Sequence, residues 1–161
     1  TESEFGIICM DASCKVEITP ASDTKGGKAA GKAFTVNMQR GQVYQVQSKD
    51  SDGTNNTNSA EFSWTGSGAR DGDMTGTKVR VVNSCAKINV FSGTRSSYVP
   101  RRNCAGFSGK DHLYTQVLPT TALGKDYVLM PYANQRNGFV YRIVAAQDST
   151  YVYINGTLKT M

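Results

Sequence analysis

Short runs of apolar residues, alternating or clustered and separated by turn-forming sequences, recur along the chain and predict β-strands. Residues 5–9 and 15–18 are separated by Met-Asp-Ala-Ser, which predicts a hairpin. Residues 34–37 and 42–48 flank an Arg-Gly pair and form the clearest predicted hairpin. Neither side of 42–48 is cleanly apolar, because valines, a tyrosine and glutamines share its two faces. This pattern indicates an edge strand or a wet sheet surface.

The end of the chain repeats the pattern of apolar and polar residues found at its beginning. Residues 141–154 fall onto residues 5–18 at a constant offset of 136 positions. The matched pairs are Ile7 with Ile143, Ile8 with Val144, Ser13 with Ser149, Val16 with Val152 and Ile18 with Ile154, while Cys9 and Cys14 match Ala145 and Thr150. Because a one-residue slip would turn every matched side chain to the other face, the shared register suggests a repeated module. The alternative is that these are two unrelated hairpins that share the residue pattern typical of β-strands.

The repeat divides the chain into two predicted parts. Residues 1–140 form one β-rich module, and residues 141–161 form either the first hairpin of a following copy or the closing hairpin of the same domain. Both terminal segments are expected to be hairpins, turning near 11–13 and 147–149, with Val16 and Val152 in matching environments. The repeat also predicts that the sequence is an excerpt from a longer, multi-module protein.

The composition agrees with an all-β fold. A chain of 161 residues is one domain of ordinary size. It contains 16 glycines and few long helix-forming runs, and residues 78–83 and 87–91 add two further predicted strands. We expect antiparallel packed sheets, sandwich-like in arrangement, with a propeller-like or solenoid arrangement of repeated hairpins as the alternative.

A long polar stretch, residues 49–73, interrupts the predicted strands and contains the single tryptophan, Trp64. Loops of this length inside a compact domain are usually functional or disordered. Its carboxylates are candidate calcium ligands, although the spacing lacks the frame of a calcium-binding helix–loop–helix. A solvated loop is the competing interpretation. The candidate ligands are Asp50, Asp52, Asp71 and Asp73.

Charge is distributed unevenly, but it predicts no nucleic-acid partner. Residues 1–74 hold 7 Lys/Arg against 10 Asp/Glu, and residues 75–161 hold 11 against 3. The basic residues of the second half are scattered singly, apart from Arg101 and Arg102, and no reading helix or aromatic platform motif accompanies them. No apolar run approaches 18 residues, so membrane insertion is not expected.

Catalytic chemistry has little support in the sequence. His112 is the only histidine, which cannot supply a clustered metal site. Residues 106–110 spell Gly-Phe-Ser-Gly-Lys, so Ser108 lacks the final glycine of a nucleophile elbow. We therefore expect a hydrogen-bonded structural histidine, no enzymatic activity and no cofactor, with calcium as the one candidate ion.

Several ordered motifs carry a family resemblance over nearly the whole chain, from about residue 5 to 157. They are GQVYQVQS, DMTGTKVRVVNSCAKINVFSGT, YVP, DHLYTQVLPTTALGKDYVLMP and YRIVAAQDSTYVYINGT. In this order they resemble the IgGFc-binding protein N-terminal domain family, a repeated, β-rich extracellular module of large surface and secreted proteins. The stretches 51–71 and 101–110 depart from the family pattern, so the resemblance implies no particular ligand.

The resemblance also bears on the four cysteines. Cys9 and Cys14 flank the first predicted turn and could lie close enough for a bridge. In the extracellular setting that the resemblance implies, a bridge between Cys85 and Cys104 would close a loop worth roughly 3 kcal/mol in the entropy model. Free, buried thiols are the alternative.

The resulting functional hypothesis is a non-catalytic, extracellular or cell-surface module serving adhesion or ligand binding. Its expected partners are neighbouring modules of the same protein and a glycan or protein ligand. The alternative is a purely structural repeat segment of a surface fibre or extracellular matrix.

Overall fold

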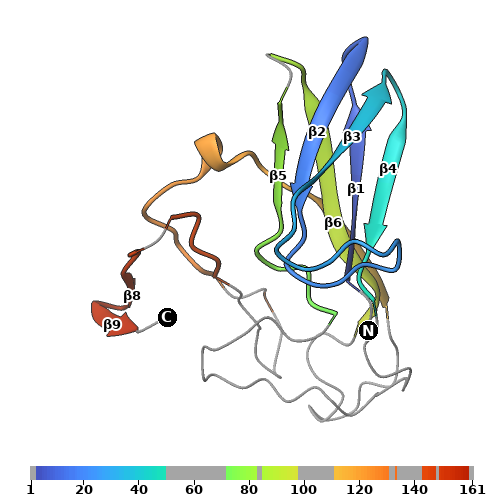
Figure 1. Cartoon of the computed structure of the whole chain (residues 1–161). Helices are drawn as coiled ribbons and strands as arrows, with labels where there is room; N and C mark the ends of the chain where they lie inside the picture. Colours follow the sequence, from blue (N-terminus) through green and yellow to red (C-terminus); the bar gives the residue numbers. More distant parts are fainter. Residues whose placement is uncertain are drawn as a thin grey trace.

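The computed structural model describes residues 3–49, 72–82, 85–97, 111–130, 133, 143–147 and 149–159. Within these residues the chain forms two packed antiparallel sheets and a separate small sheet (Figure 1). The four-stranded sheet has the order β4 (Val43–Gln47), β1 (Ser3–Cys9), β6 (Ile88–Ser97) and β7 (Asp111–Gln116). The three-stranded sheet has the order β3 (Phe34–Gln39), β2 (Ser13–Thr19) and β5 (Lys78–Val81). The remaining elements are the 3-10 helix η1 (Thr120–Ala122) and the pair β8 (Val152–Ile154) and β9 (Thr157–Lys159).

The core lies between the two larger sheets. Because side chains alternate along a strand, β1 turns every second residue inward and β2 does the same from the opposite sheet. Side chains from β3 and β4 and a methionine before β5 complete the buried set. Its members are Phe5, Ile7, Cys9, Cys14, Val16, Ile18, Met38, Val46 and Met74. The predicted all-β fold of packed antiparallel sheets is therefore confirmed, in its sandwich-like form.

The predicted hairpin of residues 5–18 is wrong, because its two strands belong to different sheets. β1 pairs with β4 and β6, whereas β2 pairs with β3 and β5. The chain does turn between residues 10 and 12, but it crosses the core there. The physical reason is that both strands bury an apolar face, and the two faces cover each other across the sandwich better than they would side by side in one sheet.

The predicted hairpin of residues 34–37 and 42–48 is wrong for the same reason. β3 lies in the three-stranded sheet and β4 in the four-stranded sheet. Phe34 and Tyr44 approach each other from the two sheets, with ring centroids 6.4 Å apart. The expectation that residues 42–48 form an edge strand is confirmed, since β4 is the outermost strand of its sheet among the described residues.

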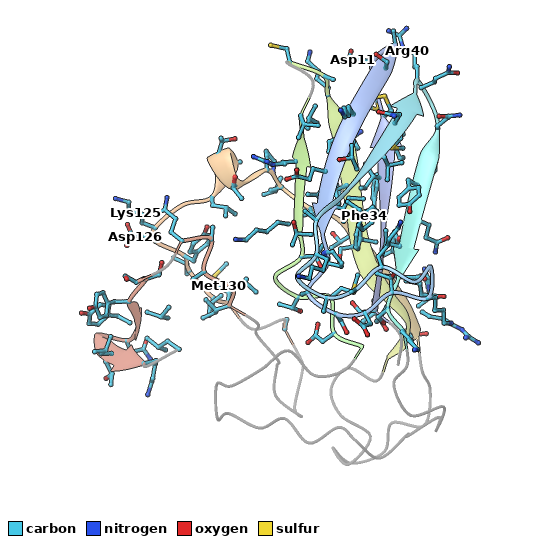
Figure 2. The ribbon with its side chains drawn as sticks, viewed as in Figure 1. Asp11, Phe34, Arg40, Lys125, Asp126 and Met130 are labelled. Carbon is cyan, nitrogen blue, oxygen red and sulfur yellow. A yellow bond between two sulfur atoms is a disulfide. The ribbon has the colours of Figure 1, made fainter. Side chains whose placement is uncertain are left out.

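The crossings between the sheets gather at one end of the sandwich. A disulfide joins Cys9 at the end of β1 to Cys14 at the start of β2, and both residues are buried. The N–H of Gly41, in the turn between β3 and β4, donates to the carbonyl of Cys9 at 2.8 Å. The N–H of Lys87, just before β6, donates to the carboxylate of Asp11 at 2.6 Å. Asp11 and Arg40 mark this end in Figure 2.

The C-terminal segment does not form the expected counterpart of residues 5–18. Residues 143–147 contain no strand, and β8 and β9 turn at Asn155-Gly156 and not near 147–149. Both turn residues have positive φ, 50° and 76°, which suits the two-residue turn that Asn-Gly favours. Val16 is fully buried and Val152 only partly, so their environments also differ. The division at residue 140 stays a prediction.

Removing the disulfide should lower stability by about 2 kcal/mol, because the closed loop is shorter than the 15-residue loop assigned about 3 kcal/mol. We expect this loss for the double variant Cys9→Ala/Cys14→Ala in urea denaturation. Reductant should then change the stability of the wild type more than that of the variant. Equal stability of the two proteins, within about 0.5 kcal/mol, would contradict this role of the bridge.

Candidate functional site

The outer surfaces of the two larger sheets differ in the side chains that they carry. The outer face of the three-stranded sheet carries polar side chains from β2, β3 and β5, including Lys15, Asn37 and Arg80. Arg80 Nε donates to Glu17 Oε1 at 2.6 Å, and this hydrogen bond holds the pKa of Glu17 below its ordinary value. Exposed ion pairs of this kind contribute little to stability. This face is a solvated surface.

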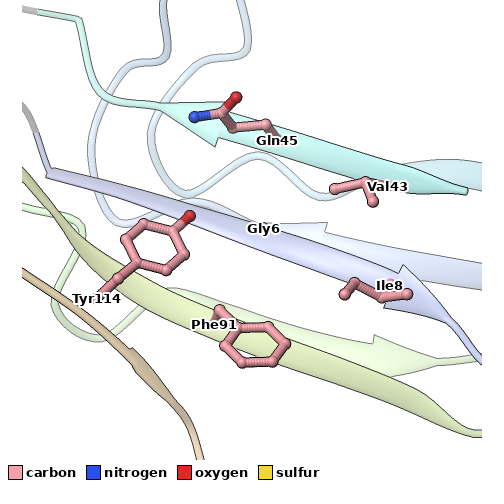
Figure 3. A pocket seen from close by; sticks show the side chains of 6 residues that line it. All are labelled: Gly6, Ile8, Val43, Gln45, Phe91 and Tyr114. Atoms are coloured by element: carbon pink, nitrogen blue, oxygen red, sulfur yellow. The ribbon is translucent and has the colours of Figure 1, made fainter.

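The outer face of the four-stranded sheet mixes apolar side chains with amides, and it is hollowed. Side chains from β1, β4, β6 and β7 surround a shallow depression of about 250 Å³ (Figure 3). Val43 on β4 is 64% exposed and lies at the edge of this depression. We call this depression the sheet-face groove. It is lined by Gly6, Ile8, Val43, Gln45, Phe91 and Tyr114.

Strand register builds the groove from distant parts of the chain. Gly6 on β1 lies opposite Gln45 on β4 and Phe91 on β6. Because cross-strand partners share a face, the missing side chain of Gly6 leaves the floor between Gln45 and Phe91 open. Tyr114 on β7 enters the same row diagonally from its position opposite Gly93.

Two glycines leave room for the Tyr114 ring to lie on the sheet. A Cβ at Gly93 would overlap the carbonyl of Leu113 and come within 2.5 Å of the Tyr114 ring. A Cβ at Gly6 would meet the Tyr114 hydroxyl at 3.4 Å, close to ordinary contact. The ring therefore lies across the backbone of β6 with its hydroxyl reaching β1. An aromatic side chain that covers a strand glycine in this way restores the lost packing.

A carboxylate held by amides borders this ring. Glu4 is almost fully buried, and its Oε2 accepts hydrogen bonds from Gln45 Nε2 at 3.1 Å and Gln47 Nε2 at 2.9 Å. Burial, and secondarily the negative charge of Glu4, raises the pKa of the Tyr114 hydroxyl above its ordinary value. The depression therefore combines an apolar floor with a rim of amide and hydroxyl groups.

His112 extends the aromatic surface of the groove. Its ring stacks on that of Tyr114, with centroids 5.4 Å apart and planes 8° from parallel. Its Nδ1 lies 3.3 Å from the carbonyl oxygen of Arg95. Ser108, the serine of the incomplete nucleophile elbow, lies outside the described residues.

Of the four candidate calcium ligands, only Asp73 lies within the described residues. Asp73 Oδ1 accepts from the backbone N–H and the hydroxyl of Thr75, at 2.9 and 2.6 Å. Asp50, Asp52 and Asp71 lie outside the described residues, as does Trp64. Among the residues that are described, no three His, Cys, Asp or Glu side chains are placed to hold a metal ion. Calcium binding by the polar stretch stays a prediction.

The second cysteine pair is described only at one member. Cys85 is exposed and has a positive φ of 61°, an uncommon conformation for a residue with a side chain. Cys104 lies outside the described residues. A Cys85–Cys104 bridge therefore also stays a prediction.

A comparison with protein-family models decides the family. The model described as IgGFc binding protein matches residues 1–161, the whole chain. The chain belongs to the IgGFc binding protein family. This is a family of extracellular binding modules, and a disulfide between Cys9 and Cys14 fits such a setting. No match was found among curated proteins or among solved structures.

The structure also bears on a membrane location. In the part of the chain that it describes, no helix has the length and apolar character needed to span a bilayer.

Sequence reasoning did not find the groove. Its β4 side was visible as the mixed pattern of residues 42–48, but Gly6, Phe91 and Tyr114 gave no signal of their own. Only strand pairing brings these three residues together.

Gly93→Ala should destabilise the protein more than Gly6→Ala, because only the former places a Cβ against backbone atoms that cannot move aside. We expect a loss of about 1–3 kcal/mol for Gly93→Ala, the usual range for overpacking, and less than about 1 kcal/mol for Gly6→Ala. Urea denaturation of the two variants measures the difference. Equal losses would show that the backbone of Leu113 does not lie against Gly93.

The Tyr114 hydroxyl should ionise above pH 10.0, the ordinary value for tyrosine, because burial and the Glu4 charge both disfavour its anion. Ultraviolet difference titration of the wild type against Tyr114→Phe isolates this group. Glu4→Gln should lower the pKa of Tyr114 part of the way, leaving the larger effect of burial. A Tyr114 pKa at or below the ordinary value would contradict the described packing.

Proposed function

We propose that this chain is a non-catalytic, extracellular binding module of a larger surface or secreted protein, and that a protein ligand contacts it through the sheet-face groove. The observation that carries the proposal is the contrast between the two outer faces of the sandwich. One face is polar and solvated, whereas the other exposes Val43 beside Ile8, Phe91 and Tyr114. Aromatic and aliphatic groups without free charge are typical of the centre of a protein interface.

The shape of the groove favours a protein over a small molecule. Its volume of about 250 Å³ falls below the roughly 300–1,000 Å³ of most small-molecule pockets. A hollow of this size accepts one or two apolar side chains of a partner. The amides of Gln45 and Gln47 are already engaged by Glu4, so they supply few new hydrogen bonds for the hydroxyl groups of a glycan.

The second candidate function is a structural segment that joins neighbouring modules and binds nothing else. The observation that favours it is the run of exposed apolar residues after β7, which the sandwich leaves uncovered. Its members include Leu118, Leu123, Tyr127, Val128, Leu129 and Met130. Neighbouring copies in a fibre would cover such residues.

Binding assays with two immobilised probes separate these functions. The first probe is the Fc fragment of IgG, suggested by the family description, and the second is a glycan array. We expect Fc binding that falls at least about tenfold in Val43→Asp, since a charge in the centre of an interface disrupts it. The matched control Val82→Asp places the same charge on an exposed valine outside the groove and should leave binding within about twofold.

The other outcomes have distinct meanings. Equal losses in both variants would remove the groove as the site. Binding to glycans alone would replace the protein ligand by a carbohydrate. Binding to neither probe would favour the structural segment.

A further inference from the structure

The gap between the two sheets is covered to different extents along the two long sides of the sandwich. On the side of β3 and β4, the Phe34 and Tyr44 rings meet across the gap, and Lys28 Nζ lies 5.1 Å from the centre of the Phe34 ring. The N–H of Lys25 also donates to the carbonyl of Gln47 at the end of β4, at 2.9 Å. This side is closed by side chains and by the loop that precedes β3.

The side of β5 and β7 is left open in the described part of the chain. Leu113 lies opposite Thr94, and the Val117 N–H donates to the Val90 carbonyl at 2.8 Å. Both side chains alternate with the outward-facing Tyr114, so they point toward the other sheet. Yet Leu113 is 40% and Val117 45% exposed. The cause is that, among the described residues, the three-stranded sheet ends at β5, one strand short of covering β7.

β5 presents a free row of backbone groups on this open side. The Val82 N–H donates to the Lys15 carbonyl at 2.8 Å, and the register continues with Arg80 opposite Glu17. In an antiparallel pair such bonds join alternate residues. The backbone N–H and C=O groups of Val79 and Val81 therefore point away from β2. Within the described residues no strand pairs with them.

The chain carries a segment with the composition of the missing strand. Residues 127–130 read Tyr-Val-Leu-Met, and Val128 is 87% exposed. The segment is assigned to no strand. Lys125, Asp126 and Met130 lie well away from the larger sheets in Figure 2. Exposed apolar side chains of this kind are a signature of an interaction site, and an open strand edge is a template for pairing with another strand.

We propose that residues 127–130 of one copy add to β5 of a second copy, as a fourth strand of its three-stranded sheet, and cover Leu113 and Val117. We choose a second copy as the partner because each chain holds its own residues 127–130 away from its own β5. Each copy therefore exposes both a donor segment, residues 127–130, and an acceptor edge, β5. Two copies then dock reciprocally, as in a two-fold dimer. Backbone bonds to Val79 and Val81 supply affinity, and alternate side chains of the segment enter the open gap.

Molar mass measured by size-exclusion chromatography with light scattering tests the proposal on the whole chain. The wild type should change from monomer to dimer as its concentration rises through roughly the micromolar range, as expected for a small interface. Val128→Lys alters only an exposed side chain of the donor segment and should stay monomeric. Val43→Lys is the matched control, because this valine is 64% exposed on the outer face of the four-stranded sheet, on a strand at the opposite side of the sandwich from β5 and β7. It should dimerise like the wild type.

The acceptor edge has its own variant. Val81→Pro removes an N–H that points away from β2, so it should abolish dimer formation while the fold, followed by circular dichroism, is retained. Mixing Val81→Pro, which keeps its donor segment, with Val128→Lys, which keeps its acceptor edge, should form a heterodimer with one docked strand.

Three outcomes would overturn the proposal. A wild type that stays monomeric at every concentration shows that no second copy docks. A dimer that survives Val128→Lys, or is lost in Val43→Lys, uses another surface. If the mixed variants form no heterodimer although Val81→Pro is folded, the segment of one copy does not dock on β5 of the other.

Discussion

The covalent and hydrogen-bonded crossing at Cys9, Asp11 and Cys14 is the constraint on which the rest of the structure depends. β1 lies inside the four-stranded sheet and β2 lies at the centre of the three-stranded sheet, so the disulfide joins the innermost strands of both. No backbone ladder links these two strands. The sheets are therefore held together by apolar contacts across the core. The crossing at one end aligns the two sheets and so fixes which residues contact each other across the core.

That alignment has consequences on the far side of the four-stranded sheet. Because Phe5 and Ile7 are committed to the core, Glu4, Gly6 and Ile8 must face outward. The outward-facing row of β1 then lacks a side chain at Gly6 and carries a carboxylate at Glu4. The amides of Gln45 and Gln47 on β4 donate to that carboxylate, and the Tyr114 ring on β7 lies across the sheet with its hydroxyl near Gly6. The same alternation that buries one face of β1 in the core therefore determines which residues of β1 line the groove on its other face.

The sequence was informative about strands and much less so about their partners. Alternation located β1 to β6 because burying one face requires a period of two. It could not distinguish a hairpin from a crossing between sheets, since both need two strands with a turn between them. Met10-Asp11-Ala12 lacks the Asn-Gly type of turn that marks a tight hairpin, whereas Asn155-Gly156 has it and does form one. The groove was not predictable, because Gly6, Phe91 and Tyr114 meet only through pairings between distant segments.

The crossing topology also shapes how fast the chain can fold. Phe5 pairs with Val46 on one side and with Ser92 on the other, so the central strand cannot be completed until most of the chain is available. Domains dominated by such distant pairings fold in milliseconds to seconds, slowly compared with helical proteins. The bridge between Cys9 and Cys14 spans a sequence separation of only 5. It can close early during synthesis, and it would then present the two innermost strands as a preformed template on which later segments assemble.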